Sequence, residues 1–251
     1  MELKVVNDPD SAAQLAAATI AADARTAIAT RSRFTLAVSG GHTPWIMLRM
    51  LAKEDVPWAG VHVYQVDERI APDGHPDRNL THIRESLLLH APLRPDQIHA
   101  MPVESADRDS AAAQYGVDLQ EIAGTPPVLD LVHLGLGPDG HTASLVPGDA
   151  VLNVTNRDVS LTGIYQGRPR MTLTYPAINR ARRVLCLVTG SEKTQMLQRL
   201  VDGDTSIPAG RVNRERALVL ADRAAAGRLM TLRTGGDKMR VENATTLVKS
   251  K

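Results

Sequence analysis

Residues Phe34–Pro44 read FTLAVSGGHTP, a short apolar run that ends in two glycines and reaches a proline. An apolar run of this length is typical of a buried strand, and proline suits the first turn of a helix. The stretch therefore predicts a strand over Phe34–Val38, a glycine turn, and a helix over Pro44–Ala52. A strand that passes directly into a helix is a building unit of α/β proteins.

The same unit recurs along the chain. Further strand-length apolar runs are Val61–Val66, Val128–Leu134, Val184–Val188 and Ala217–Leu220. Asp, Gly and Thr-Gly directly follow the first three of them, and Asp222 comes two residues after the fourth. Helix-like segments alternate with these runs, and they are Pro9–Thr30 behind the N-cap residue Asp8, Leu80–Leu89, Ala106–Ile122 and Glu192–Val201. This alternation predicts the α/β class: an open, mostly parallel, Rossmann-like sheet with helices on both faces.

A hairpin is predicted as an addition to that sheet. The runs Val159–Ile164 and Met171–Thr174 flank the turn-like segment Tyr165–Pro169. Two strand-like runs separated by a short segment that contains glycine indicate antiparallel pairing.

Length and composition favour one globular domain. A chain of 251 residues with 43% hydrophobic and 23% charged residues buries a full core without disulfides or metals. We expect a single α/β domain over residues 1–230 and a polar C-terminal tail over residues 231–251. Because the tail has few large apolar residues, we predict that it is mobile, with a docked segment as the alternative.

Net charge and aromatic content indicate which classes of binding partner the protein has. The 29 Lys and Arg residues balance 28 Asp and Glu residues, so the chain has no overall field that attracts nucleic acid or a membrane surface. With two Trp, four Tyr and one Phe, it is poor in stacking platforms for single-stranded nucleic acid. We therefore expect a small-molecule partner and a monomer or small homo-oligomer. Cys186, the only cysteine, lies in an apolar run and is interpreted as a buried, inert thiol.

The N-terminal sequence and the helices predict a cytoplasmic location. Residues 1–10 include acidic side chains and lack the apolar core of a secretory signal. The Ala-rich run Ala12–Ala29 contains Gln14, Asp23 and Arg25, which argues against a membrane span.

Polar segments follow four of the predicted strands. They are Ser39–Pro44, Asp67–Arg69, Gly135–His141 and Thr189–Lys193. Ligands of open parallel sheets bind beyond the carboxyl ends of the strands, so these segments are expected to converge on one rim.

Gly40 and Gly41 stand just before a predicted helix start. Exposed backbone N–H groups at the positive end of a helix dipole suit a phosphate, although an ordinary turn is the alternative. The segment Ala37–Gly41 also fits a nucleophile elbow around Ser39. The nucleophile of that fold follows several strands, whereas Ser39 has at most one strand before it, so we do not favour this interpretation.

Gly135–Gly140 matches the pattern G-x-G-x-x-G but is not expected to bind a dinucleotide. The dinucleotide fingerprint needs a long helix that starts inside it, and Pro147 with Gly148 stops any helix soon afterwards. What remains is Asp139 and His141, an acid and an imidazole two residues apart on a strand-end loop. Imidazole is the natural general base near neutral pH, and a solvated loop is the alternative.

Three cations, Arg69, Arg170 and Lys193, lie at or near the same predicted rim. Guanidinium and ammonium groups hold a dianion by bidentate and point-charge contacts, although each alone also fits an ordinary surface charge. The chain has no H-E-x-x-H motif and no cysteine pair, so we predict no metal site.

Together these segments resemble the family of glucosamine-6-phosphate isomerases and 6-phosphogluconolactonases. The similar segments are Leu36–Pro44 as the phosphate loop, Asp67–Arg69 with Asn79, Gly135–Gly148 as the catalytic loop, Arg170–Thr174 and Gly190–Lys193. They occur in the family's order and spread over most of the chain.

The residues resemble the lactonase branch more than the isomerase branch. After Asp-Gly-His the isomerases continue with an Asn-Glu-Pro stretch that carries a catalytic glutamate, whereas Thr142–Pro147 has no carboxylate before Asp149. Arg69 stands where the isomerases usually have an aromatic residue. The chain also departs from the family at His42, where the phosphate loop usually has Ser, and at Val146, where Phe is usual.

The resemblance implies hydrolysis of 6-phospho-D-glucono-1,5-lactone to 6-phospho-D-gluconate in the oxidative pentose phosphate pathway, without a cofactor. It implies that His141 takes a proton from the attacking water, that Asp139 orients the imidazole, and that Arg69 favours the oxyanion. The implied substrate-binding residues are Gly40, Gly41, His42, Thr43, Asp67, Asn79, Arg170 and Lys193, with the phosphate held by the 40–43 loop, Arg170 and Lys193. A glucosamine-6-phosphate deaminase/isomerase and a non-catalytic phosphosugar-binding module remain the alternatives.

Overall fold

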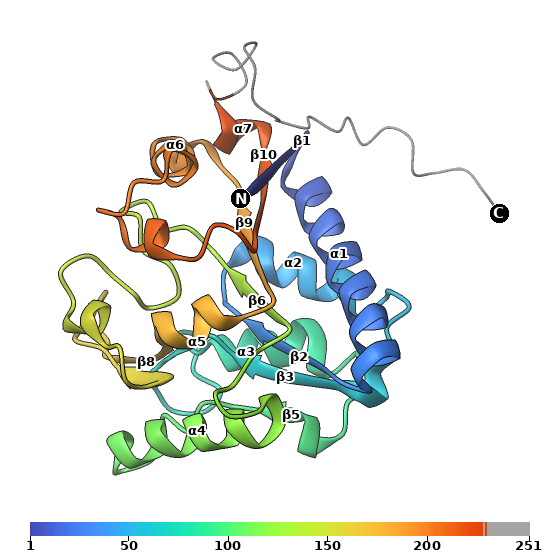
Figure 1. Ribbon diagram of the computed structural model, residues 1–251, viewed down its shortest axis with the longest axis vertical. Coiled ribbons are helices and arrows are strands. Elements are labelled where there is room, and N and C mark those ends of the chain that lie inside the picture. The colour runs from blue at the N-terminus through green and yellow to red at the C-terminus, as the bar shows by residue number, and fades with distance from the viewer. Residues whose placement is uncertain (228, 230–251) are drawn as a thin grey trace.

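The computed structural model describes residues 1–227 and 229, and its main element is a seven-stranded sheet (Figure 1). The strand order is β1-β10-β9-β6-β2-β3-β5 and every neighbouring pair is parallel. The strands are β1 (Glu2–Val6), β2 (Phe34–Val38), β3 (Val61–Gln65), β5 (Ile98–His99), β6 (Leu131–Leu134), β9 (Arg183–Val188) and β10 (Ala217–Asp222). The predicted open parallel sheet is confirmed.

Helices cover both faces of this sheet and enclose two separate apolar clusters. Figure 1 shows α1 to the right of the sheet and α5 and α6 to its left. One cluster lies under α1 (Pro9–Arg31), α2 (His42–Leu51), α3 (Asn79–Ile83) and the π-helical turn Arg84–Leu88. The other lies under α4 (Arg108–Ala123), α5 (Tyr175–Arg180), α6 (Thr194–Asp202) and α7 (Arg223–Ala226). Short helical turns complete the described part, at Trp58–Gly60, Pro95–Gln97, Ala150–Asn153, Ser191–Lys193 and Pro208–Arg211.

The local sequence explains how these elements begin and which way they face. The carboxylate of Asp8 accepts a hydrogen bond from the backbone N–H of Ser11 at 2.7 Å and caps α1, whose first residue is Pro9. In β2, Leu36 contributes to one cluster and Ala37 to the other, because successive strand side chains point to opposite faces. The continuous apolar runs in the sequence follow from this burial on both faces.

The predicted hairpin forms, but not in the parallel sheet. β7 (Val159–Leu161) pairs antiparallel with β8 (Arg170–Leu173), and β8 pairs with β4 (Asp67–Arg69) in a separate three-stranded sheet. The prediction that the hairpin adds to the main sheet is therefore wrong. The chain continues from β3 directly into β4. Between these two strands, the backbone carbonyl of Val66 accepts a hydrogen bond from the N–H of Leu173 at 2.8 Å, so the second sheet begins where β3 ends.

Both edge strands of the main sheet were absent from the sequence prediction. β1 has apolar residues only at three of its five positions, and β5 has two residues. The predicted tail at 231–251 lies outside the described residues. None of the described helices combines the length and apolar character needed to cross a lipid bilayer.

Candidate active site

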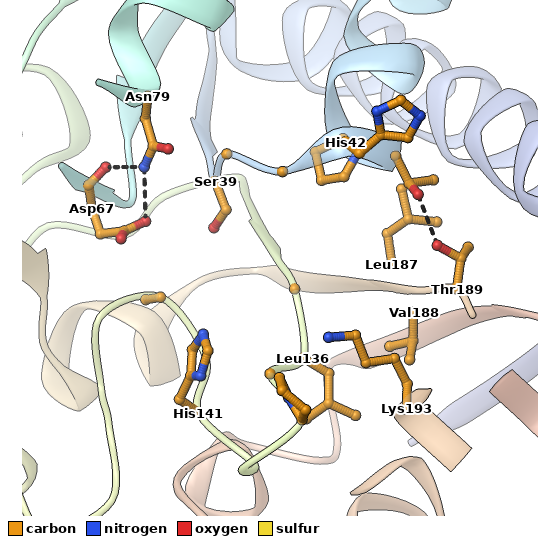
Figure 2. A pocket seen from close by; sticks show the side chains of 18 of the residues that line it. Ser39, His42, Asp67, Asn79, Leu136, His141, Leu187, Val188, Thr189 and Lys193 are labelled. Carbon is orange, nitrogen blue, oxygen red and sulfur yellow. Dashed lines mark hydrogen bonds between the residues drawn. The ribbon is translucent and has the colours of Figure 1, made fainter. Parts of the chain in front are cut away.

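A cavity of about 390 Å³ lies where loops from both sheets meet (Figure 2). Its lining includes residues from all four polar segments that follow the strands, together with Asn79, Ala143 and Arg170. The predicted convergence on one rim is confirmed. A volume of this size is within the range of small-molecule sites.

The loop between β2 and α2 contributes backbone donors to the cavity. Gly41 is the N-cap of α2 with φ 128°, a conformation that favours glycine, and no side chain caps the helix. The first N–H groups of α2 are therefore without a side-chain acceptor, and an anion suits this position. Figure 2 shows the imidazole of His42 pointing away from His141 and Lys193, so His42 offers the cavity its backbone N–H group.

The loop after β9 lies beside this helix start. The hydroxyl groups of Thr43 and Thr189 are 2.7 Å apart and hydrogen-bond the two loops together. Figure 2 shows the ammonium group of Lys193 directed into the cavity. Within residues 1–227 and 229 it has no hydrogen-bond or ion-pair partner, so its charge is available to a ligand.

Gly40 permits a close approach between the two sides of the cavity. A Cβ atom at this position would lie 2.0 Å from Oδ1 of Asn79. That oxygen accepts from the guanidinium of Arg69 at 2.7 Å, and the amide nitrogen of Asn79 donates to the backbone carbonyl of Asp67 at 2.9 Å. The glycine therefore leaves room for the side chain that holds Arg69.

Arg69 and Arg170 face each other across β4 and β8. Each has a buried Nε with no hydrogen-bond partner among the described residues. Burial, and next the charge of Arg69, lower the pKa of Arg170, which is 4% exposed. Two neighbouring guanidinium groups with unused donors favour an anionic ligand or a developing negative charge.

A buried ion pair supports the loop that carries Arg69. Glu68 is fully buried and lies 3.1 Å from Nε of Arg78, which is also buried. Its carboxylate also accepts from the backbone N–H groups of Arg69, Asn79 and Leu80, each at 2.8 Å. Because the removal of one partner leaves an uncompensated buried charge, this pair holds the segment between β4 and α3 in one arrangement.

His141 faces the cavity from the loop after β6, as Figure 2 shows. Its Nδ1 is 2.6 Å from Oδ1 of Asp139, and its backbone N–H donates to the same oxygen at 3.1 Å. Burial raises the pKa of Asp139, but the hydrogen bonds from His141 and Tyr165 outweigh it and the net pKa is lowered. A carboxylate only accepts, so Nδ1 carries the proton and Nε2 is left as the acceptor.

The backbone of this loop brings the imidazole to its place. The N–H of Gly137 donates to the carbonyl of His141 at 2.8 Å, and a Cβ atom at Gly137 would lie 2.0 Å from Nδ1 of His141. No helix starts in Gly135–Gly140, since the next helical turn begins at Ala150. The loop is therefore built to hold an imidazole rather than a dinucleotide.

The structure brings together the predicted site residues. Ten of them line the cavity, namely Gly40, Gly41, His42, Thr43, Asp67, Arg69, Asn79, His141, Arg170 and Lys193. Asp139 contacts His141 from outside the lining. Their individual roles stay predictions. The hydroxyl of Ser39 donates to the carbonyl of His133 at 3.0 Å, which does not favour the nucleophile elbow. Cys186 is buried as predicted, and burial raises its pKa to about 12.

Sequence reasoning missed three side chains of the site. Ser144 donates from its hydroxyl to Asp67 at 2.6 Å, Glu68 organises the loop after β4, and Tyr165 contacts Asp139. Ser144 and Glu68 lie in the segments Gly135–Gly148 and Asp67–Arg69, which resemble the family, but the sequence does not indicate which residues they contact. The available signal for Tyr165 was its position as the first residue of the predicted hairpin turn.

Comparisons with known proteins identify the family of this chain. A family model described as glucosamine-6-phosphate isomerases/6-phosphogluconolactonase matches residues 7–220. A 6-phosphogluconolactonase of Synechocystis sp. is 42% identical over 175 residues, covering 68% of this chain and 72% of the relative. One of Streptomyces coelicolor is 33% identical over 249 residues, covering 91% of this chain and 94% of the relative.

Solved structures show the same architecture. A 6-phosphogluconolactonase from Trypanosoma cruzi superposes with a TM-score of 0.82 at 26% identity, covering 91% of this chain and 96% of the other. A monomeric glucosamine-6-phosphate deaminase has a TM-score of 0.78 at 17% identity, with 90% of this chain and 99% of the other covered. That second likeness concerns the fold alone.

Proposed function

The chain belongs to the family of glucosamine-6-phosphate isomerases and 6-phosphogluconolactonases, and from this premise we propose how its cavity performs catalysis. The reaction is the hydrolysis of 6-phospho-D-glucono-1,5-lactone to 6-phospho-D-gluconate, a step of the oxidative pentose phosphate pathway. The observation that carries the proposed mechanism is the Asp139–His141 pair, whose imidazole faces a cavity that is also lined by Arg69, Arg170 and Lys193.

His141 is the general base in this proposal. Nε2 takes a proton from water while the water oxygen attacks the lactone carbonyl carbon. The tetrahedral intermediate then collapses, the bond between C1 and the ring oxygen breaks, and the proton on His141 passes to that oxygen, which becomes a hydroxyl. Asp139 keeps the Nδ1 proton in place during both transfers and balances the charge of the imidazolium.

Arg69 stabilises the negative charge that develops on the carbonyl oxygen. Its guanidinium is fixed by Asn79, and its Nε has no partner among the described residues. A preorganised cation beside the oxyanion lowers the barrier, since the charge is larger in the transition state than in the substrate.

The phosphate binds at the start of α2. The backbone N–H groups of the 40–43 loop and the ammonium of Lys193 supply its donors there, and Arg170 supplies a further cation. Asp67 and Asn79 contact the sugar hydroxyl groups. Binding energy from the phosphate holds the lactone carbonyl near His141.

The contacts of Asp149 argue against the isomerase alternative. Asp149 is the first carboxylate after the Asp-Gly-His motif, where the isomerases carry a catalytic glutamate. Its two oxygens accept from the backbone N–H groups of Val151 and Gly163, each at 2.9 Å. This carboxylate caps a helical turn and is thus occupied away from the cavity.

The decay of the lactone, followed by NMR with and without the purified protein, tests the proposed function. We expect decay well above the spontaneous rate, with 6-phosphogluconate as the product. Ammonia release from glucosamine 6-phosphate would instead identify the isomerase, and phosphosugar binding without turnover of either substrate would identify a binding module. The cytoplasmic location and a monomeric or small homo-oligomeric state stay predictions.

A further inference from the structure

Tyr165 lies behind the proposed general base, and its hydroxyl is within reach of both partners of the pair. It donates to Oδ2 of Asp139 at 3.0 Å and is 3.3 Å from Nδ1 of His141. The phenol ring meets the imidazole edge-on, with 5.3 Å between the ring centroids. Asp139 thus uses one oxygen for the imidazole and the other for the phenol.

Tyr165 also supports a cation of the cavity. The guanidinium carbon of Arg170 lies 4.9 Å from the centroid of the Tyr165 ring, and Nη2 of Arg170 donates to the backbone carbonyl of Tyr165 at 3.4 Å. A guanidinium over an aromatic face is attracted by the ring quadrupole. The side chain of Tyr165 therefore contacts both the Asp139–His141 pair and Arg170, a proposed phosphate-binding residue.

Neither Tyr165 nor Asp139 belongs to the cavity lining formed by the described residues, whereas His141 and Arg170 do. Any effect of Tyr165 on the reaction must therefore pass through these two side chains.

The hairpin that carries Tyr165 is fixed in place. Tyr165 and Arg168 exchange backbone hydrogen bonds at 3.0 and 3.3 Å across the turn residues Gln166 and Gly167, both with positive φ. Arg168 forms an ion pair with Asp77 on the neighbouring loop. The turn that precedes β8 is thus attached to the segment that follows β4.

The direction of the phenol hydrogen bond follows from charge. Burial, and then the carboxylate of Asp139, raise the pKa of Tyr165, so the phenol keeps its proton at neutral pH. The pKa of Asp139 is lowered, so its carboxylate accepts.

We propose that Tyr165 is a positioning residue for the general base. Its hydroxyl occupies the second oxygen of Asp139, which keeps the first oxygen on Nδ1 of His141 and leaves Nε2 directed into the cavity. Its ring seats Arg170. This inference rests on the proposed role of His141.

A hydroxyl in this position also tunes the pH dependence of the reaction. The charged and titratable groups beside the imidazole are Asp139, Tyr165 and Arg170, and the rest of the cavity lining adds Arg69, Asp67, Lys193, Glu192 and His42. Without the phenol proton, the carboxylate of Asp139 attracts the imidazolium more strongly. The acid limb of kcat/KM is then expected to move to higher pH.

Two substitutions separate the hydroxyl from the ring. Tyr165→Phe keeps the ring under Arg170 and is expected to lower kcat about tenfold, the usual scale for a hydrogen bond to a charged group, and to move the acid limb upward. KM and competition by inorganic phosphate should stay as in the wild type. Tyr165→Leu should add a several-fold rise in KM and in the inhibition constant of phosphate, because Arg170 loses its aromatic support.

Tyr175→Phe is the matched control, since its hydroxyl donates to the carbonyl of Pro208 at 2.8 Å and touches no proposed catalytic group. It should leave kcat and the pH profile unchanged. A Tyr165→Phe enzyme with the wild-type kcat and acid limb would overturn the inference, and so would an equal shift in the Tyr175→Phe control. Full activity of His141→Ala would instead refute the proposed mechanism, so the two failures are distinguishable.

Discussion

The two walls of the cavity are built on different principles. The wall at the ends of the parallel strands offers backbone N–H groups, a lysine and the imidazole, all from loops that follow β2, β6 and β9. The wall on the small antiparallel sheet offers Arg69, which is held by the buried side chain of Asn79, and Arg170, which packs on the half-buried ring of Tyr165. Backbone geometry fixes most of the first wall, with the imidazole also held by Asp139, whereas the second wall depends on chains of side-chain contacts. Substitutions in the second wall should therefore be coupled to one another more strongly.

The largest expected effect is at His141, where the two walls meet. His141→Ala removes the proposed base and should lower kcat by roughly 10²–10⁴, the range for general acid–base catalysis. Inorganic phosphate should compete as it does in the wild type, because the proposed phosphate-binding residues remain. Steady-state kinetics on the folded variant test this, and the exposed His90 provides the control, since His90→Ala should retain full activity. A folded His141→Ala enzyme with wild-type kcat would exclude this histidine as the base.

The next largest effect is expected from the removal of one cation from each wall. Lys193→Ala and Arg170→Ala each remove a charge-assisted contact worth about 1.5–3 kcal/mol, so phosphate should inhibit roughly 10–150 times more weakly. The comparison of walls predicts a further difference: Arg170→Ala also lowers kcat, because Arg170 packs on Tyr165, whereas Lys193→Ala leaves kcat nearly unchanged.

A double-mutant cycle measures that coupling. Arg170→Ala combined with Tyr165→Leu should cost less than the sum of the single changes, and Lys193→Ala combined with Tyr165→Leu should be additive. If both pairs are additive, the second wall is not a coupled unit. If phosphate inhibits the wild type and the single variants equally, the phosphate pocket is misplaced.

Gly40→Ala tests the contact between the walls. The added Cβ would lie 2.0 Å from Oδ1 of Asn79, so the amide must move and Arg69 loses its acceptor. Overpacking of this kind costs about 1–3 kcal/mol. We expect a lower thermal midpoint together with a lower kcat. Gly116→Ala in α4 is the control, because Val159, at 4.0 Å, is the nearest described side chain to its Cβ. This substitution should lower neither quantity.

The same contrast explains what the sequence could predict. Segments such as Ser39–Pro44 and Gly135–His141 follow apolar strands, and parallel strands bring their carboxyl ends to one edge, so convergence followed from local patterns. The loop proposed to be catalytic also has an unusual composition, with Pro138 and Gly140 around Asp139. The parallel wall was therefore largely predictable.

The second wall depends on contacts between distant residues. β4 is the three residues Asp67–Arg69, which have no apolar pattern, and its partner Thr172 lies more than a hundred residues along the chain. Glu68 has the sequence character of a surface charge, yet it is fully buried against Arg78. The hydroxyl of Tyr165 finds its acceptor on Asp139, in another loop. Pairing of this kind leaves no local signal in the sequence.

The smallest expected effect concerns acid stability and belongs to the parallel wall. His133 in β6 is fully buried, and its Nδ1 accepts from the backbone N–H of Ser39 at 3.4 Å, directly before the phosphate loop. Burial lowers the pKa of His133 to about 4. The second wall has the buried pair Glu68–Arg78 instead, whose charges compensate each other.

The sign of the effect follows from proton binding. An unfolded histidine titrates near pH ~6.5, so between that pH and about 4 the unfolded chain binds a proton that folded His133 does not. The free energy of unfolding should therefore fall as the pH falls through this window, by about 1–2 kcal/mol between pH 6.5 and 5 from this residue. Urea unfolding at pH 6.5, 5.7 and 5, above the usual range of carboxyl groups, measures the slope. His133→Asn should reduce the slope by the contribution of this residue, whereas the exposed His90→Asn should leave the slope unchanged. His99 adds to the slope in all three proteins, since burial lowers its pKa to about 4 as well. Equal slopes in all three proteins would show that His133 does not contribute to the acid sensitivity.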